Sequence, residues 1–254
     1  MKDILLKLKS GEITVEEADL EIEKRLLSGG QHTIDPGRED RTAVPEVVLA
    51  EGKSGEQIVD VAIEFVKRTG RAIITRLDKD KSDRLIQSVR SHQHLIIEYD
   101  DLSKTAVIRT GDFEQPENRG KVGFITAGTS DIRVIREAEI ISREMGCETS
   151  SHYDVGVAGL HRIFRPLKSL ERWGADALVV AAGREGALPT LVSGLTRIPV
   201  IGLPVSVGYG IHPAGETALF SMLQSCSPLA VVNIDAGFVA GSVAAKIALR
   251  ANGH

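Results

Sequence analysis

The stretch ALVVAAGREG, residues 177–186, decides the fold class that the sequence predicts. It opens with an unbroken apolar run, which is typical of a strand covered on both faces, and such strands belong to parallel sheets. Its glycine-rich end, GREG, predicts a turn out of the strand. A helical stretch follows at 187–196, so the segment predicts a strand–turn–helix unit of an α/β protein.

The same unit recurs on both sides of this segment. Short apolar or β-rich runs occur at VGFIT (122–126), ETSSHY (148–153), PVIGLP (199–204) and LAVVNI (229–234). Helical stretches separate these runs at 131–145, 161–173, 216–225 and 238–251. Strands that alternate with helices require right-handed crossover connections. We therefore predict a doubly wound, parallel five-stranded sheet over residues 120–254.

The N-terminal part, residues 1–115, predicts a smaller α/β domain. Capping boxes at Thr14–Glu17 and Ser54–Gln57 indicate the starts of helices. Three β-rich runs predict strands: RAIITR, HLIIEYD and TAVIRT. The segment GDFEQPENRG, residues 111–120, carries Pro, Gly and charge without periodicity, which predicts a boundary between the two domains.

The composition of the 254 residues excludes several classes of protein. Lys and Arg number 31 against 35 Asp and Glu, a net charge of −4, whereas a nucleic-acid binder usually carries a basic surplus. Aromatic residues make up only 4%, too few for base-stacking surfaces. No apolar run approaches the ~18 residues of a membrane span, and no signal-peptide pattern opens the chain. We expect a soluble cytoplasmic protein that binds neither nucleic acid nor a membrane.

Polar, glycine-rich loops follow the predicted strands, at the edge where open α/β sheets bind ligands. The clearest is Gly128-Thr129-Ser130-Asp131: glycine admits a close approach, the hydroxyls donate hydrogen bonds, and the N-terminus of the next helix attracts phosphate. The loop matches neither GxGxxG nor GxxxxGK[ST], which disfavours a dinucleotide finger and a P-loop. Capping of the next helix by Ser130 or Asp131 explains the same residues and is compatible with phosphate binding.

The later loops add further candidates. His161 and Arg162 are predicted to open a helix, where the dipole keeps a histidine neutral and the arginine fork holds phosphate or carboxylate. Glu185 lies between two glycines and is a candidate for proton transfer, with Asp154 as a weaker one. We expect Tyr209, in the loop after PVIGLP, to contact the substrate. Structural or merely solvated roles stay open for each of them.

The chain has two cysteines, Cys147 and Cys226. Because they form no CxxC pair, they exclude a disulfide framework and a zinc ribbon and suit a reducing compartment. Cys147 precedes a predicted strand, where ordinary packing is expected. Cys226, in MLQSCSPLAVV, is either a small buried side chain or a nucleophile, and its own position leaves both open.

Five motifs occur together in the C-terminal half: TAGTSD, YDVGVAGLHR, GREGALPTLVSGL, PVIGLPVSVGYG and MLQSCSPLAVVNIDAGFVAG. With them the chain resembles the LarB family, which makes the first intermediate of the nickel-pincer nucleotide cofactor. The stretch IDPGREDRTAVPEVVLAEGKSGEQI extends this resemblance over nearly the whole chain. The C-terminal half is similar to the PurE aminoimidazole ribonucleotide carboxylases, which implies a PurE/flavodoxin-like sheet.

The resemblance implies carboxylation of the pyridinium ring of nicotinic acid adenine dinucleotide at C5, with carbon dioxide as the carboxyl source. It also implies hydrolysis of the phosphoanhydride, which yields AMP and pyridinium-3,5-biscarboxylic acid mononucleotide. Magnesium is the implied ion, and no organic cofactor is bound permanently. PurE-like domains form octamers through their C-terminal helices, so we expect a homo-octamer, with the small residues of GSVAAKIALRA packing between subunits.

The resemblance makes Cys226 the nucleophile. A pyridinium ring is electron-poor, but a thiolate that adds at C4 turns C5 into an enamine carbon able to attack carbon dioxide. Glu185 is then the expected proton-transfer group, and His161, similar in position to the catalytic histidine of PurE enzymes, is the second choice. The 128–131 loop and Arg162 would hold phosphate or carboxylate, and Asp131 or Asp154 would position magnesium, although the metal ligands are not assigned.

Some residues depart from the family pattern, namely Arg184, Ala236 and Ile211-His212-Pro213. They surround the expected site without replacing its cysteine, glutamate or histidine. Two alternatives stay open: a PurE-type carboxylase or mutase, and a non-catalytic nucleotide-binding protein. Cys226 and the long N-terminal part disfavour the first. We also expect the N-terminal domain to recognise the adenosine half of the substrate through the charged loop 35–41.

Overall fold

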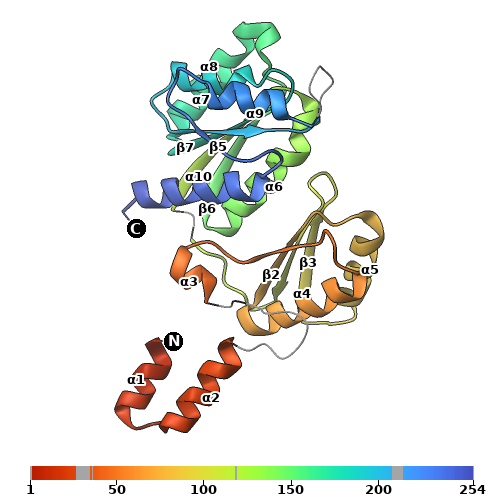
Figure 1. Ribbon diagram of the computed structural model, residues 1–254, viewed down its shortest axis with the longest axis vertical. Helices are drawn as coiled ribbons and strands as arrows, with labels where there is room; N and C mark the ends of the chain where they lie inside the picture. Colours follow the sequence, from red (N-terminus) through yellow and green to blue (C-terminus); the bar gives the residue numbers. More distant parts are fainter. Residues whose placement is uncertain (1, 27–34, 36, 118, 208–213, 254) are drawn as a thin grey trace. The chain divides into compact units, whose positions relative to one another are not determined.

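The structure is a computed structural model that describes residues 2–26, 35, 37–117, 119–207 and 214–253. The chain folds as two compact units (Figure 1). The first unit comprises residues 1–98 and 106–113, and the second comprises residues 99–105 and 114–254.

The second unit is built on an all-parallel, five-stranded sheet in the order β6-β5-β7-β8-β9. Its strands are β5 (Gly120–Thr126), β6 (Cys147–His152), β7 (Ala177–Ala182), β8 (Val200–Pro204) and β9 (Ala230–Val231). Numbered from β5, the order is 2-1-3-4-5, the flavodoxin-like arrangement. The predicted doubly wound parallel sheet is confirmed.

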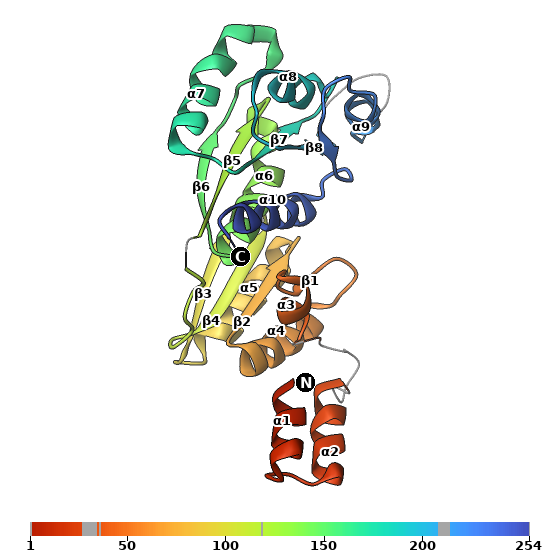
Figure 2. The ribbon, with the colours of Figure 1, turned by 90° about the vertical axis from the view of Figure 1, so that its left-hand side faces the viewer.

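Helices cover both faces of this sheet (Figure 2). One face carries α6 (Ile132–Glu144) and α10 (Gly237–Ala251); the other carries α7 (Phe164–Trp173), α8 (Ala187–Leu195) and α9 (Glu216–Leu223). Every residue of β7 is buried, as its unbroken apolar run predicts, and Leu178 and Val180 join the core beneath α7, α8 and α9. Within the described ranges, no helix has the length and apolar character needed to cross a membrane.

The helix pair α6 and α10 is packed closely enough to require glycine. A Cβ atom on Gly241 would lie 2.4 Å from the Ala138 carbonyl oxygen. The Ser142 hydroxyl donates to the Gly241 carbonyl at 3.1 Å, and Ala244, Ala245 and Ala248 are fully buried. The small residues of α10 that we expected between subunits are therefore buried against α6 of the same chain.

The first unit has a four-stranded mixed sheet in the order β1-β2-β4-β3, with β1 parallel and β4 antiparallel to β2. Its strands are β1 (Val47–Leu49), β2 (Arg71–Thr75), β3 (Leu95–Asp100) and β4 (Thr105–Thr110). Its helices are α1 (Lys2–Ser10), α2 (Val15–Leu26), α3 (Arg38–Thr42), α4 (Gly55–Thr69) and α5 (Lys79–Arg90). Both predicted capping boxes are present, and the N–H of Glu17 donates to Thr14 Oγ1 at 3.1 Å.

Two predicted boundaries were wrong. The helix predicted from 161 becomes an α-helix only at Phe164, after the 3₁₀ segment η2 (Val157–Ile163), whereas the 3₁₀ turn η1 (Thr129–Asp131) leads into α6 within one residue of the predicted start. The run LAVVNI forms only the two-residue strand β9, which pairs with β8 alone. Beyond it the chain turns at Asn233, whose carbonyl accepts from Ala236 N–H at 3.2 Å. Apolar pattern cannot distinguish a full strand from an edge strand that turns early.

The contact between α6 and α10 can be tested with Gly241→Ala. Alanine is favoured over glycine in a helix by about 1 kcal/mol, but here its methyl group would collide with backbone of α6. We expect the substitution to destabilise the protein by about 1–3 kcal/mol, as overpacking does. Chemical denaturation measures whether the substitution lowers or raises the free energy of unfolding. The exposed Val239→Ala on the same helix is the control. A Gly241→Ala variant that is more stable than the wild type would contradict the close packing of α6 and α10.

Candidate active site

The carboxyl ends of the parallel strands meet at one edge of the second unit's sheet. Four loops at this edge hold a non-glycine residue at positive φ: Asp154 at 59°, Arg184 at 44°, Ala214 at 63° and Asp235 at 54°. Such conformations cost on the order of 1–3 kcal/mol and persist where the surroundings enforce them, typically at functional sites. This edge is therefore the candidate site, as predicted from open α/β sheets.

The loop after β5 is closed from inside by Asp131. Its Oδ2 accepts from the Gly128 N–H at 2.8 Å, and the Ser130 hydroxyl donates to Oδ1 at 3.4 Å. The side chain is only 3% exposed, and this burial raises the pKa of the carboxyl. Asp131 thus closes the 3₁₀ turn through the Gly128 N–H, but its side chain makes no hydrogen bond that caps α6, so the expected helix cap by Asp131 is absent. Thr129 and Ser130 stay exposed, and the first amides of a helix have no partner within it.

The loop after β6 presents Asp154 and Arg162 together. The Asp154 N–H donates to Thr126 Oγ1 at 3.1 Å, while Arg162 donates to the Asp154 carbonyl at 3.2 Å and to its carboxylate at 3.5 Å. A Cβ atom on Gly156 would lie 2.8 Å from the Ala127 carbonyl oxygen, so this loop packs directly against the loop after β5. The sequence-predicted residues of these two loops are therefore neighbours.

His161 lies in the 3₁₀ segment η2 and is exposed. We expected it at the N-terminus of an α-helix, but α7 begins at Phe164. That expectation was wrong, since a 3₁₀ segment holds His161, and Gly159 within this segment leaves helical geometry, with φ −127° and ψ 72°. His161 follows the same loop as Asp154.

The loop after β7 forms a tight turn that carries Glu185 into solvent. The Gly186 N–H donates to the Gly183 carbonyl at 2.9 Å, and Gly186 has φ 61°. A Cβ atom on Gly183 would lie 2.4 Å from the Val207 carbonyl oxygen and 3.6 Å from Asp131 Oδ1. Glycine is therefore required where this loop crosses its neighbours, and Glu185, two residues after Gly183, is exposed.

Sequence reasoning missed several residues that organise this edge. Asp235, after β9, accepts from the Ser206 N–H at 2.9 Å and from its hydroxyl, which ties the loops after β8 and β9 together. Arg133 on α6 donates to the Ser206 hydroxyl at 3.2 Å. Thr126 holds Asp154, as described above. Nothing in the spacing distinguishes these residues, because their partners are far away in sequence.

Two further predictions concern Tyr209 and the charged loop 35–41. Tyr209 lies outside the described residues. In the charged loop 35–41, Arg41 pairs with Asp35 at 2.5 Å, and Arg71 donates to both oxygens of Glu39 at 2.9 and 2.8 Å. Three of the charges that suggested substrate recognition, Asp35, Glu39 and Arg41, are thus paired within the first unit.

The carboxylates at the carboxyl edge of the sheet are the candidate ligands for the magnesium ion that the family resemblance implies. Within the described ranges, no group of three or more His, Cys, Asp or Glu is arranged to hold a metal. Asp131 faces an amide and a hydroxyl, and Asp154 faces Arg162. Magnesium is usually bound through one or two carboxylates together with substrate phosphates. The residues present do not fit a preformed magnesium site.

Cys226 lies away from these loops. It is exposed and sits between α9 and the amino end of β9. The Ser193 hydroxyl, near the end of α8, donates to the Pro228 carbonyl, so the Cys226 segment packs at the end of α8 opposite to Glu185. With 9 residues, α8 is about 13 Å long. One chain therefore does not bring Cys226 and Glu185 together.

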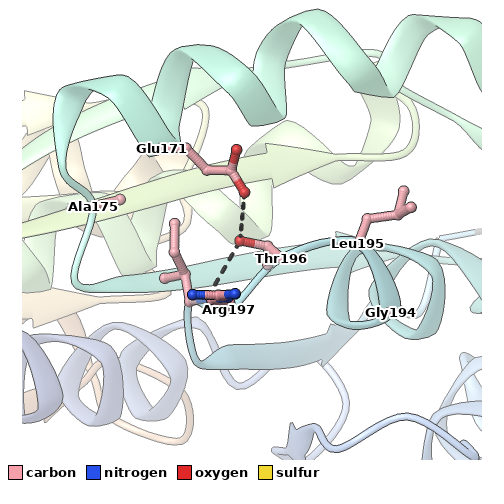
Figure 3. A pocket seen from close by; sticks show the side chains of 7 residues that line it. Glu171, Ala175, Gly194, Leu195, Thr196 and Arg197 are labelled. Atoms are coloured by element: carbon pink, nitrogen blue, oxygen red, sulfur yellow. Dashed lines mark hydrogen bonds between the residues drawn. The ribbon is translucent and has the colours of Figure 1, made fainter.

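A pocket of about 530 Å³ opens at the same amino edge of the sheet as Cys226 (Figure 3). Its lining residues are Glu171, Ala175, Gly194, Leu195, Thr196, Arg197 and Ile198. Thr196 donates to Glu171 at 3.0 Å across it. A Cβ atom on Gly194 would lie 3.3 Å from the Ser227 hydroxyl, so the Cys226 segment adjoins the pocket wall.

The burial of Asp131 predicts a stability that depends on pH. Burial disfavours the ionised carboxylate, so the wild type loses stability as pH rises from the ordinary aspartate range through the raised pKa of Asp131. We expect Asp131→Asn, which keeps an acceptor for Gly128, to raise Tm by a few degrees at neutral pH. In calorimetry the gain should vanish near pH 3, where both states are protonated. The exposed Asp101→Asn is the control; an equal gain at every pH would contradict this account.

Comparisons with known proteins agree with the fold. Residues 121–253 match the AIR carboxylase family, and residues 28–110 match the LarB/PurE-like N-terminal domain. The chain is 32% identical to an N5-carboxyaminoimidazole ribonucleotide mutase of Thermotoga maritima, over 50% of this chain and 74% of the relative. It is 28% identical to a phosphoribosylaminoimidazole carboxylase of Schizosaccharomyces pombe, over 54% of this chain and 24% of the relative.

One similarity covers both units. An uncharacterized protein of Methanocaldococcus jannaschii is 39% identical over 98% of this chain and 96% of its own length. The carboxylase and mutase relatives, by contrast, match about half of the chain. The C-terminal domain is thus related to carboxylases and mutases, and with the N-terminal domain in front of it the chain belongs to the LarB family.

Proposed function

We propose that this protein carboxylates C5 of the pyridinium ring of nicotinic acid adenine dinucleotide and hydrolyses its phosphoanhydride. The observation that carries the proposal is the contrast between the two cysteines. Burial raises the pKa of Cys147 to about 12, which leaves it an inert core thiol. Cys226 is exposed, on a chain of the LarB family, and is therefore the thiol available for covalent catalysis.

The chemistry requires such a thiol. The Cys226 thiolate adds to C4 of the pyridinium ring, and the ring becomes a neutral dihydropyridine whose C5 is nucleophilic. C5 then attacks carbon dioxide and forms a carbon–carbon bond. A base removes the C5 proton, the electron pair of the C5–H bond restores the aromatic ring, and the thiolate leaves from C4. Water cleaves the phosphoanhydride and releases AMP.

The loops at the carboxyl edge suit the remaining roles. Glu185 is exposed in a tight turn and serves as the acceptor of the C5 proton. The exposed hydroxyls of Thr129 and Ser130, with Arg162 on the adjacent loop, bind phosphate or carboxylate. His161 stays the second candidate for proton transfer. Magnesium, where it takes part, enters with the substrate phosphates.

The separation of Cys226 from Glu185 within one chain means that the proposed mechanism requires more than one protomer. For both groups to reach one pyridinium ring, they must come from different protomers, so the active enzyme is a homo-oligomer with shared sites. The surface next to Cys226 suits such an interface: on α9, Phe220 and Leu223 are 57% and 61% exposed. An oligomer as large as an octamer is compatible with this requirement.

A second candidate function is that of the named relatives, a carboxylase or mutase acting on an aminoimidazole ribonucleotide. The similarity between the C-terminal half of the chain and these relatives favours this second function. Its substrate ring is already electron-rich and needs no thiol, so this reaction should be indifferent to Cys226.

The role of Cys226 is tested by mass spectrometry of turnover with nicotinic acid adenine dinucleotide, carbon dioxide and magnesium. The wild type should yield the dicarboxylated mononucleotide and AMP. Cys226→Ala should lose at least about a thousandfold in rate, because the covalent route is closed. Cys147→Ala is the matched control and should keep its catalytic rate while losing some stability, since its side chain is 1% exposed.

The other outcomes separate the alternatives. Product from the wild type and from Cys226→Ala at similar rates would keep the carboxylase and refute the covalent mechanism. No product from this substrate, with turnover of an aminoimidazole ribonucleotide, would establish the second candidate. Binding without turnover of either would indicate a nucleotide-binding protein that is not an enzyme.

Shared sites are tested by mixing inactive variants. Cys226→Ala and Glu185→Gln are each expected to be inactive alone, but when co-expressed they should form sites with an intact cysteine from one protomer and an intact glutamate from the other. Random assembly restores roughly one quarter of the wild-type activity. Activity that stays at the level of the single variants would refute the shared site, and light scattering on the same samples reports whether they assemble.

A further inference from the structure

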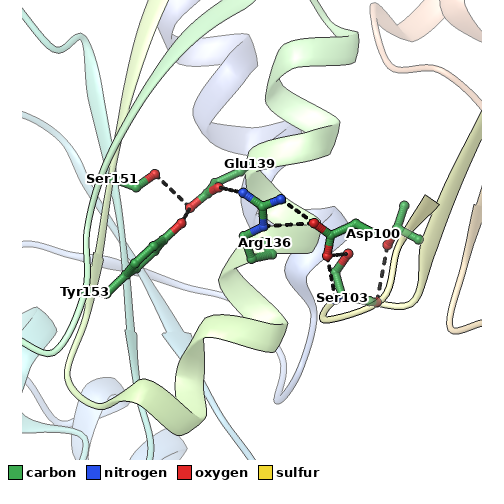
Figure 4. Close-up of polar contacts among 7 residues, drawn as sticks. Asp100, Ser103, Arg136, Glu139, Ser151 and Tyr153 are labelled. Carbon is green, nitrogen blue, oxygen red and sulfur yellow. Dashed lines mark hydrogen bonds and ion pairs between the residues drawn. The ribbon is translucent and has the colours of Figure 1, made fainter. Parts of the chain in front are cut away.

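Glu139 on α6 is a buried carboxylate that receives hydrogen bonds from both sides (Figure 4). Its residue is 3% exposed. The hydroxyls of Ser151 and Tyr153 both donate to its Oε1, each at 2.7 Å, and Arg136 donates to its Oε2 at 3.3 Å. A buried carboxylate is stable only when it is paired and hydrogen-bonded, so this arrangement is a rigid anchor.

Arg136 is itself held from the opposite side. It donates through Nε to Asp100 at 3.1 Å, and Asp100 accepts from the Ser103 N–H at 2.8 Å. Figure 4 shows Ser151 and Tyr153 on one side of Glu139 and Asp100 beyond Arg136 on the other. The positive charge of Arg136 is therefore shared by two carboxylates, and neither is buried without a counter-charge.

Tyr153 connects this anchor to the candidate site, because the next residue is Asp154. Asp154 has φ 59°, a left-handed conformation that aspartate adopts more readily than most residues but that still costs free energy relative to the ordinary backbone regions. On its far side the turn is tied to β5: the N–H groups of Asp154 and Val155 donate to the hydroxyl and carbonyl of Thr126 at 3.1 and 2.8 Å. On its near side the Tyr153 phenol is fixed to Glu139. Burial and this hydrogen bond raise the pKa of Tyr153, so its phenol stays a donor at neutral pH.

We propose that Tyr153 is a positioning residue, which through its hydrogen bond to Glu139 sets the Asp154 turn. This turn accepts hydrogen bonds from Arg162 and so holds its guanidinium where it meets the anionic part of the substrate. The benefit to substrate binding rests on the proposed function. The constraint on the turn does not, because it follows from the hydrogen bonds alone.

Ser151 provides a matched control. Tyr153→Phe and Ser151→Ala each remove one hydroxyl from the same oxygen of Glu139, at the same 2.7 Å distance. Ser151 lies inside β6, paired with Phe124, and does not adjoin Asp154. A merely structural role would make the two variants alike, whereas a positioning role affects Tyr153→Phe alone.

The first measurement is amide hydrogen exchange on the full-length protein without ligand. The amides of Asp154 and Val155 should exchange about tenfold faster in Tyr153→Phe than in the wild type, and should be unchanged in Ser151→Ala. Equal exchange in the wild type and in Tyr153→Phe would overturn the proposal. So would equal acceleration in both variants. This readout does not depend on which reaction the protein catalyses.

The second measurement is steady-state kinetics with nicotinic acid adenine dinucleotide. Tyr153→Phe should raise KM about tenfold with kcat changed less than about twofold, and Ser151→Ala should leave both constants as in the wild type. Unchanged KM in an active Tyr153→Phe enzyme with accelerated exchange would overturn the substrate-presenting role. A wild type without turnover would refute the proposed function instead, and the exchange experiment would still decide whether Tyr153 sets the turn.

Discussion

The all-parallel sheet of the second unit is the constraint on which the site depends. Parallel neighbours can be joined only by crossovers, so each strand ends at one edge and each helix returns the chain to the other. Loops that are remote in sequence, after β5, β6 and β7, thereby become neighbours, and Asp131 comes to lie beside Gly183. The same rule puts Cys226, which precedes a strand, at the opposite edge.

The carboxyl edge is held in shape by buried polar groups. Asp131 closes the first loop, Thr126 and Glu139 fix the second from opposite sides, and Asp235 joins the last two through Ser206. These contacts support backbone conformations that would otherwise be unfavourable at Asp154 and Asp235. Such an edge is preorganised, which limits the entropy that a bound anion must remove.

Much of this fold was predictable because its determinants are local. The unbroken apolar run of β7 and the reciprocal capping pair Ser54–Gln57 each express a preference of neighbouring residues. The misplaced boundaries have a different origin. At His161 a 3₁₀ segment precedes the α-helix, and in LAVVNI the edge position of β9 shortened the strand. Neither effect is visible in a window of ten residues.

The sequence by itself determined the order of strands and helices, the family and the polar loops, because periodicity, turn chemistry and motifs are written along the chain. Only the tertiary structure decided which of those groups meet. It paired Asp154 with Arg162, and it assigned the small residues of α10 to packing on α6. It also separated Cys226 from Glu185 by the length of a helix. Proximity in space is a property of how the layers pack, and packing depends on all the elements at once.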